Sequence, residues 1–204
     1  MKIAIIGSGV EAFSCGHRLL DINPSLNIHI FDKKAESGMY GEEPGIYSDW
    51  PIIPDKWSGN LYSQTPNKFS SAIRYSWFVK SISISLADRG VYLHLKSVVK
   101  SIRHNTVEYY GAGFSGAGKM DFDKIIDLRN MDEGALWFGG VTISKTNEKI
   151  FGIRPDNTIE IWSKKPSLGD NLVQRMEWRG ENPRSALVDR INAGINAAET
   201  SLSE

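Results

Sequence analysis

The sequence lacks a pair of cysteines, an excess of charge of one sign and a long apolar run, three features that would narrow the function. It has one cysteine, Cys15, so no disulfide can form within the chain, which favours a reducing compartment. It has no excess charge, because 24 Lys and Arg residues balance 24 Asp and Glu residues. A neutral chain has no overall field to attract nucleic acid or anionic lipid. We therefore expect no nucleic-acid partner.

Long apolar runs are also missing. The run 3–6 stops at a glycine and is too short for a signal-peptide core. No stretch approaches the ~20 apolar residues that a membrane-spanning helix needs, so we expect a cytoplasmic protein without a membrane partner. The histidines lack metal-ligand spacing, so no metal site is predicted; they are His17, His29, His94 and His104.

The first 32 residues contain the main motif. The apolar run 3–6 is typical of a buried parallel strand, and apolar residues then recur at helical spacing until Pro24. A second apolar run, 28–31, ends at Asp32. The order strand, glycine turn, helix, strand and acid predicts a dinucleotide-binding βαβ unit. The turn is a G-x-G-x-x-A made of Gly7, Ser8, Gly9, Val10, Glu11 and Ala12.

Each key position of this motif has a physical reason. Gly7 permits a tight turn, Gly9 leaves space for a pyrophosphate beside the backbone, and Ala12 allows close helix–strand packing. The helix N-terminus offers N–H groups and a partial positive charge to phosphates. Asp32, 20 residues after Ala12, is placed to accept hydrogen bonds from the adenosine ribose. Its charge disfavours the 2′-phosphate of NADP, and the two lysines that follow it weaken that discrimination.

The segment after Asp32 resembles a known family. Lys33 follows the acid, and Gly38 and Met39 come a few residues later. This succession is similar to that of flavoproteins with a glutathione-reductase-type Rossmann domain, which have a Gly-Gly pair where Gly38-Met39 stands here. The resemblance implies FAD as the cofactor, with NAD or NADP as the alternative. It also adds Lys33 and Met39 to the predicted cofactor-binding residues.

A second similarity to the same family covers residues 87–130. A helix end is followed by strand-like runs of a small antiparallel meander, and 122–127 predicts a return strand. The resemblance implies that the backbone near Val99 faces adenine. A departure is Leu128-Arg129-Asn130, where the family has Ala-Thr-Gly. An alanine-rich helix within 183–200 is similar to the helix that approaches the flavin in that family.

Residues 111–119, "GAGFSGAGK", contain a second G-x-G-x-x-G and a near-Walker A pattern. Both motifs need a helix directly after the glycines. The residues that follow alternate between apolar and charged, which predicts a strand. We therefore interpret the segment as a hairpin tip between two strands of the meander.

The rest of the chain is less specific. Residues 39–66 form an aromatic loop that either lines a flavin or substrate pocket or covers a core edge; its aromatic residues are Tyr40, Tyr47, Trp50, Trp57 and Tyr62. Asn67 is predicted to cap a helix that continues to Leu86. Three strand-like runs in 136–163 predict a small antiparallel sheet or extra strands on the main one, with a turn at Asp156-Asn157.

The predicted fold is α/β, a Rossmann-like parallel sheet with a small antiparallel β-meander and additional strands. We expect residues 1–204 to be one FAD/NAD(P)-binding domain, with a dinucleotide βαβ unit (1–35), the aromatic loop (36–66), a helix and β-meander (67–130), and extra strands with a closing helix (131–204). The chain is short for a flavoprotein of this class. A partner subunit or a homodimer is therefore expected to complete the site, unless a small reductant acts directly.

The expected function is that of an FAD-binding flavoprotein, an oxidoreductase or monooxygenase, or the FAD subunit of one, acting on a small-molecule substrate. The alternatives are an NAD(P)-dependent reductase and a non-catalytic dinucleotide-binding partner subunit. No catalytic residue is predicted. Cys15 has no C-x-x-C context and is expected to be a packed thiol.

Overall fold

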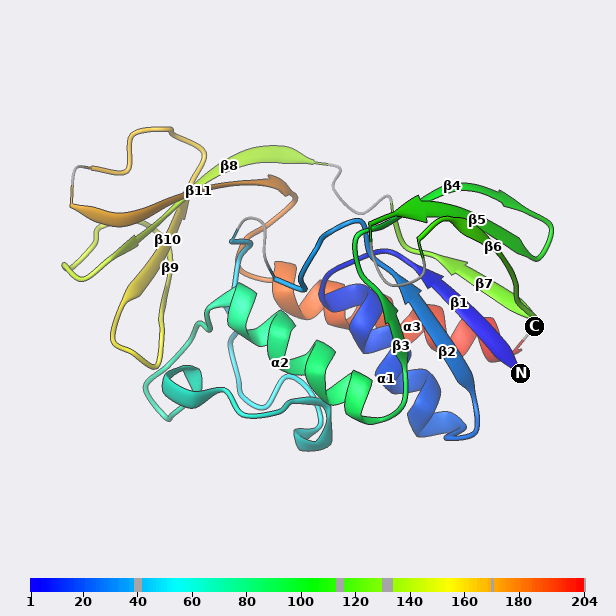
Figure 1. Cartoon of the computed structure of the whole chain (residues 1–204). Helices are drawn as coiled ribbons and strands as arrows, with labels where there is room; N and C mark the ends of the chain where they lie inside the picture. The colour runs from blue at the N-terminus through cyan, green and yellow to red at the C-terminus, as the bar shows by residue number, and fades with distance from the viewer. Residues whose placement is uncertain (39–41, 113–115, 130–133, 170, 204) are drawn as a thin grey trace.

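A parallel sheet forms the centre of the computed structural model, which describes residues 1–38, 42–112, 116–129, 134–169 and 171–203. Its four strands are β1 (Lys2–Ile6), β2 (Asn27–Phe31), β3 (Tyr92–His94) and β7 (Lys124–Asp127), in the order β3-β2-β1-β7. Every neighbouring pair runs parallel (Figure 1). The predicted strand–helix–strand start and the return strand are confirmed, and the α/β, Rossmann-like fold class is correct.

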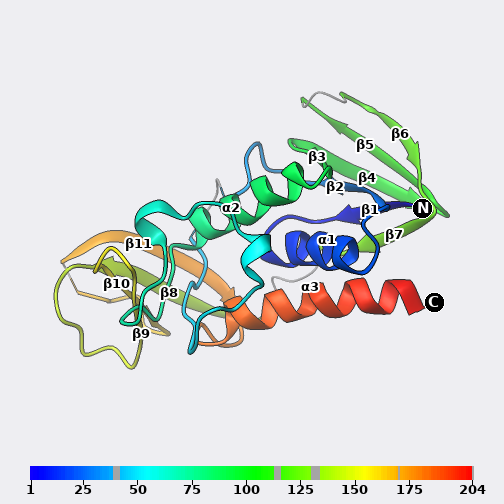
Figure 2. The ribbon, with the colours of Figure 1, turned by 90° about the horizontal axis from the view of Figure 1, so that it is seen from below.

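Both faces of this sheet are covered, which explains why β1 and β2 carry buried apolar residues on both faces. Ile3 and Ile5 of β1 point into a core shared with the helices, whereas Ala4 and Ile6 pack under the meander. Side chains alternate between faces along a strand, so each strand contributes to two cores. Figure 2 shows the helices on one side of the sheet and the meander on the other.

Three helices cover one face: α1 (Val10–Ile22), α2 (Tyr75–Asp88) and α3 (Ala186–Ser203). A glycine lets α3 pack closely along α1. A Cβ atom on Gly194 would lie 2.2 Å from the carbonyl oxygen of Glu11 and 3.0 Å from the amide nitrogen of Cys15, closer than such atoms can approach. Arg190 lies one helical turn before Gly194, so this contact also brings Arg190 to the start of α1.

The meander covers the other face. It consists of β4 (Ser97–Arg103), β5 (Thr106–Gly111) and β6 (Gly118–Asp121), paired antiparallel in that order. The glycine-rich run 111–119 therefore connects two strands and is followed by β6 rather than by a helix, although residues 113–115 lie outside the described residues. The hairpin interpretation of the second glycine motif is confirmed.

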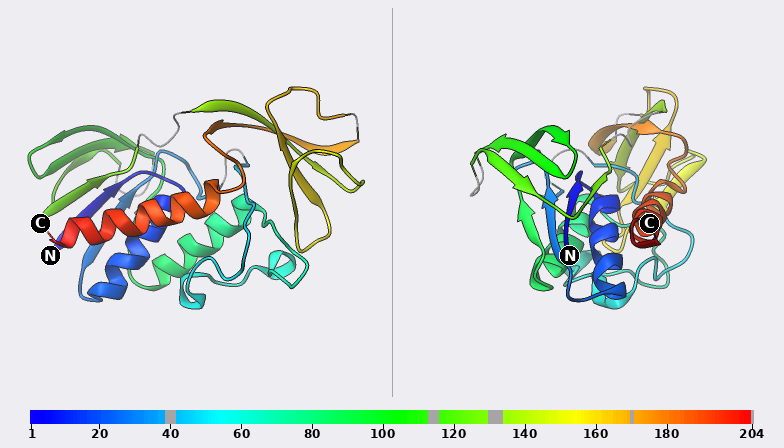
Figure 3. Two further views of the ribbon diagram at one scale, coloured as in Figure 1. Left: turned by 180° about the vertical axis from the view of Figure 1, so that it is seen from behind. Right: turned by 90° about the vertical axis from the view of Figure 1, so that its right-hand side faces the viewer.

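A second antiparallel sheet lies at the opposite end of the molecule from the meander (Figure 3). Its order is β11-β8-β10-β9, with β8 (Ala135–Thr142), β9 (Ile150–Ile153), β10 (Ile159–Ser163) and β11 (Leu172–Gly180). The three predicted strands and the turn at Asp156-Asn157 are confirmed. The strand β11 was not predicted. Its buried Met176 and Trp178 alternate with exposed Arg175 and Glu177, and this period of two is typical of a strand.

A buried ion pair connects this sheet to the loop that follows β2. The guanidinium of Arg154 lies 2.7 Å from Oε2 of Glu160, and both side chains are almost completely buried. The other carboxylate oxygen, Oε1, accepts hydrogen bonds from the backbone N–H of Gly45 and from the indole of Trp162, each at 2.8 Å. Full satisfaction of its carboxylate is what makes a buried glutamate tolerable.

The predicted helix cap at Asn67 is wrong, because α2 begins at Tyr75 with Arg74 as its N-cap. The backbone between these points is used elsewhere. Ala72 donates its N–H to the carbonyl of Ile153, and Ile73 donates to Gly45. Asn67 instead accepts the N–H of Phe69 in a turn. Tertiary hydrogen bonds therefore outweigh the local capping preference. No helix of the described residues combines the length and apolar character needed to cross a membrane.

The close packing of α3 on α1 can be tested with Gly194→Ala. We expect the variant to lower the free energy of unfolding by about 1–3 kcal/mol, because the added Cβ would meet backbone atoms that cannot move aside. Chemical denaturation monitored by circular dichroism measures the change. The exposed Asn196→Ala on the same helix is the control, and alanine should stabilise there slightly. Equal stability of Gly194→Ala and wild type would contradict the packing argument.

Candidate functional site

A cavity of about 270 Å³ opens at the carboxyl ends of the parallel strands. Ligands of open α/β sheets bind at this edge. Ile6 and Phe31, the last residues of β1 and β2, form part of its wall, and Leu128, which follows β7, forms another part. The other lining residues are Gly7, Ser8, Glu11, Lys33, Lys34, Glu43, Ser97, Val98, Val99, Arg129 and Arg190.

The glycine turn between β1 and α1 requires glycine at both positions. Gly7 has φ +151° and Gly9 has φ +101°, a region that residues with a side chain rarely adopt. A Cβ on Gly7 would also lie 3.2 Å from the carbonyl oxygen of Leu128. On Gly9 it would lie 3.0 Å from Oε2 of Glu11 and 3.2 Å from the hydroxyl of Tyr75. Because Gly7 and Gly9 have no side chains, the backbone at these two positions can lie close to the cavity.

The structure brings part of the predicted cofactor-binding set to this cavity. Gly7, Ser8, Glu11, Lys33 and Val99 line it. The others lie beside it: Gly9, Val10 and Ala12 form the turn and the start of α1, with Val10 and Ala12 fully buried, Asp32 is buried between two lining residues, and Met39 lies outside the described residues.

Asp32 is in an unusual state for a carboxylate. Its Oδ1 accepts the backbone N–H of Lys34 at 2.8 Å, whereas its buried Oδ2 has no hydrogen-bond partner among the described residues. Burial raises the pKa of this carboxyl, although the Lys34 amide, the nearby Ser8 hydroxyl and the charges of Lys34 and Lys33 act in the opposite direction; no hydrogen bond of normal geometry reaches Oδ2 from Ser8. A buried acceptor without a donor is costly, so Oδ2 is suited to accept a hydrogen bond from a ligand.

A cluster of charged residues at the start of α1 was not expected from the sequence. Nε of Arg190 lies 3.1 Å from Oε1 of Glu11, and its Nη1 also bonds a carboxylate oxygen of Glu43. The guanidinium lies over the Trp178 ring, with its Cζ 5.7 Å from the ring centroid. Arg190 stands between Asp189 and Ile191 in the last helix, and the local sequence does not single it out.

Arg129, which follows β7, is a second cation of the cavity wall that sequence analysis did not single out. Its guanidinium lies 2.5 Å from Oδ2 of Asp127, and this pair is partly open to solvent. The hydrogen bond from Arg129 holds the pKa of the Asp127 carboxyl below its usual value. Arg129 belongs to the Leu128-Arg129-Asn130 segment that departs from the expected Ala-Thr-Gly, and it places a charged side chain in this wall of the cavity.

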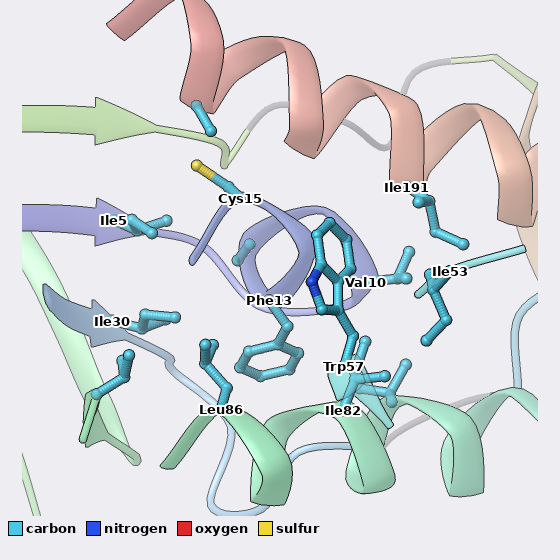
Figure 4. Close-up of a cluster of buried hydrophobic side chains, with 14 of the residues drawn as sticks. Ile5, Val10, Phe13, Cys15, Ile30, Ile53, Trp57, Ile82, Leu86 and Ile191 are labelled. Atoms are coloured by element: carbon cyan, nitrogen blue, oxygen red, sulfur yellow. The ribbon is translucent and has the colours of Figure 1, made fainter. Parts of the chain in front are cut away.

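The described aromatic side chains of the loop 39–66 do not line the cavity, and most of them pack on the core. Tyr47 and Trp57 are 2% exposed and belong to the core cluster around α1. Figure 4 shows Trp57 among the side chains of this cluster. Trp50 packs against that cluster, and Tyr62 is exposed. None of these four lines the cavity, and Tyr40 lies outside the described residues.

Cys15 is buried in the same core cluster as the aromatic loop. Burial raises the pKa of its thiol to about 12. At neutral pH the thiol therefore stays protonated and is a poor nucleophile, which fits a packing role. Among the described residues, no group of three His, Cys, Asp or Glu side chains is arranged to hold a metal ion.

Comparison with known proteins gives a fold but no family. No family model and no curated protein sequence matches the chain. Among solved structures, CabE, an aromatic hydroxylase from angucycline biosynthesis, matches 99% of the chain with a TM-score of 0.62 at 10% identity. A flavoprotein/dehydrogenase from Cytophaga hutchinsonii matches 100% of it with a TM-score of 0.57 at 10% identity, and the chain covers 78% of that protein.

CtdE, solved in complex with FAD and a substrate, matches 99% of the chain with a TM-score of 0.53 at 8% identity. The chain has the fold shared by these three proteins. It spans only 62% of the length of CabE and 65% of that of CtdE. The likeness therefore extends over this whole chain but not over the whole of those enzymes.

The state of Asp32 can be tested by the pH dependence of stability. Because the folded protein raises the pKa of this carboxyl, its ionisation costs folding free energy as the pH rises above the usual Asp range. We expect Asp32→Asn to gain stability relative to wild type between about pH 3 and about pH 6, measured by denaturant unfolding.

Asp127→Asn is the matched control with the opposite sign. The pKa of Asp127 is lowered in the fold, so its ionised form contributes stability that is lost as the pH falls. This variant should therefore lose stability relative to wild type as the pH rises to about 5, above which the Asp127 carboxyl is ionised in both the folded and the unfolded state. A parallel response of the two variants would show that Asp32 does not ionise in the environment described.

Proposed function

We propose that this protein is a flavoprotein that binds FAD in the cavity at the glycine turn. The observation that carries the proposal is the unpartnered Oδ2 of Asp32, buried at the end of β2 next to a cavity lined by Gly7 and Ser8. An acid in this position usually accepts a hydrogen bond from a ribose hydroxyl. The adenosine and diphosphate of FAD therefore match the chemistry of the cavity wall.

The residues of the cavity divide into an adenosine end and a diphosphate end. Val98 and Val99 of β4, together with Phe31, offer an apolar wall for adenine, and Asp32 is the ribose acceptor. Gly7 and Ser8, with the N-terminal turn of α1, form the diphosphate end, where a helix N-terminus favours negative charge. A bound flavin would supply hydride or oxygen chemistry to a small-molecule substrate.

An oxidoreductase or monooxygenase activity is the finer part of the proposal. It is supported by the fold shared with an aromatic hydroxylase, a flavoprotein/dehydrogenase and an FAD complex. Because the chain spans about two thirds of the length of CabE or CtdE, we propose that a second subunit or further polypeptide completes the substrate site. NADP is the second candidate ligand, since Lys33 and Lys34 line the cavity beside Asp32 and could bind a 2′-phosphate.

The cofactor can be identified directly. The purified protein is denatured, the visible spectrum of the supernatant is recorded, and the refolded or ligand-free protein is titrated with FAD, NAD and NADP by calorimetry. We expect a flavin spectrum, or tight binding of FAD with a raised melting temperature. Oxidation of NADH or NADPH by the loaded protein then separates a catalytic flavoprotein from a non-catalytic subunit. A protein that is stabilised by NADP and not by FAD would contradict the proposal.

The role of Asp32 gives a second test. Asp32→Asn should weaken FAD binding by about tenfold or more, because a hydrogen bond to a charged acceptor contributes roughly 1.5–3 kcal/mol. Asp55→Asn, an exposed aspartate of the short helix 55–57, is the matched control and should leave the affinity unchanged. Unchanged FAD affinity in Asp32→Asn would show that the ribose is not held at the end of β2.

A further inference from the structure

The charge distribution in the cavity singles out one cation at the diphosphate end. Four cationic side chains and two carboxylates line the cavity. Lys33 and Lys34 follow Asp32 and belong to the ribose end, and Arg129 pairs with Asp127 at a partly open edge. Arg190, by contrast, is in contact with the first turn of α1 through Glu11 and is about nine-tenths buried.

Two carboxylates hold Arg190, and they differ in how they are placed. Glu11 belongs to α1 itself and is 3% exposed, so its position is fixed by the helix. Glu43 lies in the loop after β2, and its side chain is 20% exposed. A ligand entering the cavity can therefore displace the carboxylate of Glu43 into solvent more easily than that of Glu11.

Residues on both sides of Glu43 are anchored, Glu42 through its carboxylate and Gly45 through its backbone N–H, which keeps Glu43 at the cavity. Glu42 accepts hydrogen bonds from Nε of Arg74 at 2.9 Å and from the N–H of Ser76 at 3.1 Å. Gly45 donates its N–H to the buried carboxylate of Glu160. The segment 42–45 is thus bound to α2 on one side and to the second sheet on the other, and only the Glu43 side chain lines the cavity.

We propose that Arg190 is a positioning residue for the diphosphate of the bound dinucleotide and that Glu43 occupies its guanidinium until the diphosphate replaces it. Glu11 keeps the guanidinium at the glycine turn throughout. Two oxygens of a phosphate group can accept a pair of hydrogen bonds, as the two oxygens of a carboxylate do, which suits the forked donors of arginine. The proposal rests on the dinucleotide-binding function proposed above, and it assigns that function a built-in competitor for the ligand.

Competition between Glu43 and the diphosphate for Arg190 predicts that removing the Glu43 charge raises the affinity for the ligand. A purely structural ion pair predicts no such gain. Glu43→Gln removes the competing charge while leaving the Glu11–Arg190 pair intact, so FAD and ADP should bind about threefold to tenfold more tightly. Arg190→Gln should weaken both by about tenfold or more, because a charge-assisted hydrogen bond is lost. Adenosine, which lacks phosphates, should bind all variants equally.

The experiment is a double-mutant cycle with Glu43→Gln, Arg190→Gln and the double variant, titrated with FAD, ADP and adenosine by calorimetry. In the Arg190→Gln background the gain from Glu43→Gln should disappear, since no guanidinium remains to compete for. Arg18→Gln and Glu199→Gln break an exposed ion pair between the same two helices, away from the cavity, and should leave affinity unchanged. Arg190→Lys keeps the charge without the fork and should give a smaller, several-fold loss.

The outcomes separate this inference from the proposed function. Wild-type protein that binds neither ADP nor FAD would refute the dinucleotide function itself. Wild-type protein that binds both ligands, with Glu43→Gln binding them no more tightly, would overturn the competition and leave the function intact. If Arg190→Gln does not fold, the Glu43→Gln and Arg190→Lys variants decide the question, and melting curves without ligand identify that case.

Discussion

The close packing of α3 on α1 at Gly194 underlies the geometry of the site. A glycine there lets the carbonyl oxygen of Glu11 approach α3 within a distance that any side chain would block. One turn earlier on α3, Arg190 consequently meets the Glu11 carboxylate in the first turn of α1. The last helix of the chain thereby completes the wall of a cavity whose other walls come from residues 6–34, Glu43, the first meander strand and the two residues after β7.

Burial of charge is the cost of this arrangement, and the structure meets it with paired groups. Glu11 and Arg190 pair at the cavity, and Arg154 and Glu160 pair inside the second sheet, where the carboxylate also binds the loop next to Glu43. A buried charge without a partner would lower the free energy of unfolding by several kcal/mol. Asp32 is the contrast: one oxygen of its buried carboxylate lacks a donor among the described residues. That unmet acceptor is the observation on which the binding role proposed for Asp32 rests.

Local sequence was sufficient wherever one element carried its own signal. The run 3–6, the glycine turn and Pro24 defined β1, α1 and the end of the helix, because backbone sterics and apolar periodicity act within a few residues. The second glycine motif was assigned to a hairpin by the alternating residues after it. The prediction failed at Asn67, where hydrogen bonds from residues 72–73 to Ile153 and Gly45 delay the helix until Tyr75. It also failed at β11, although apolar and polar residues alternate along that strand.

The sequence by itself determined the parallel βαβ start, the acid at its end and the resemblance to FAD-binding proteins, since these depend on spacing within one segment. Only the tertiary structure decided that Trp57 belongs to the core and not to the cavity, and that Glu11, Glu43 and Arg190 meet. Arg190 is 179 residues from Glu11 in the chain (190 − 11). No local pattern links such distant residues, because their contact depends on how closely two helices pack.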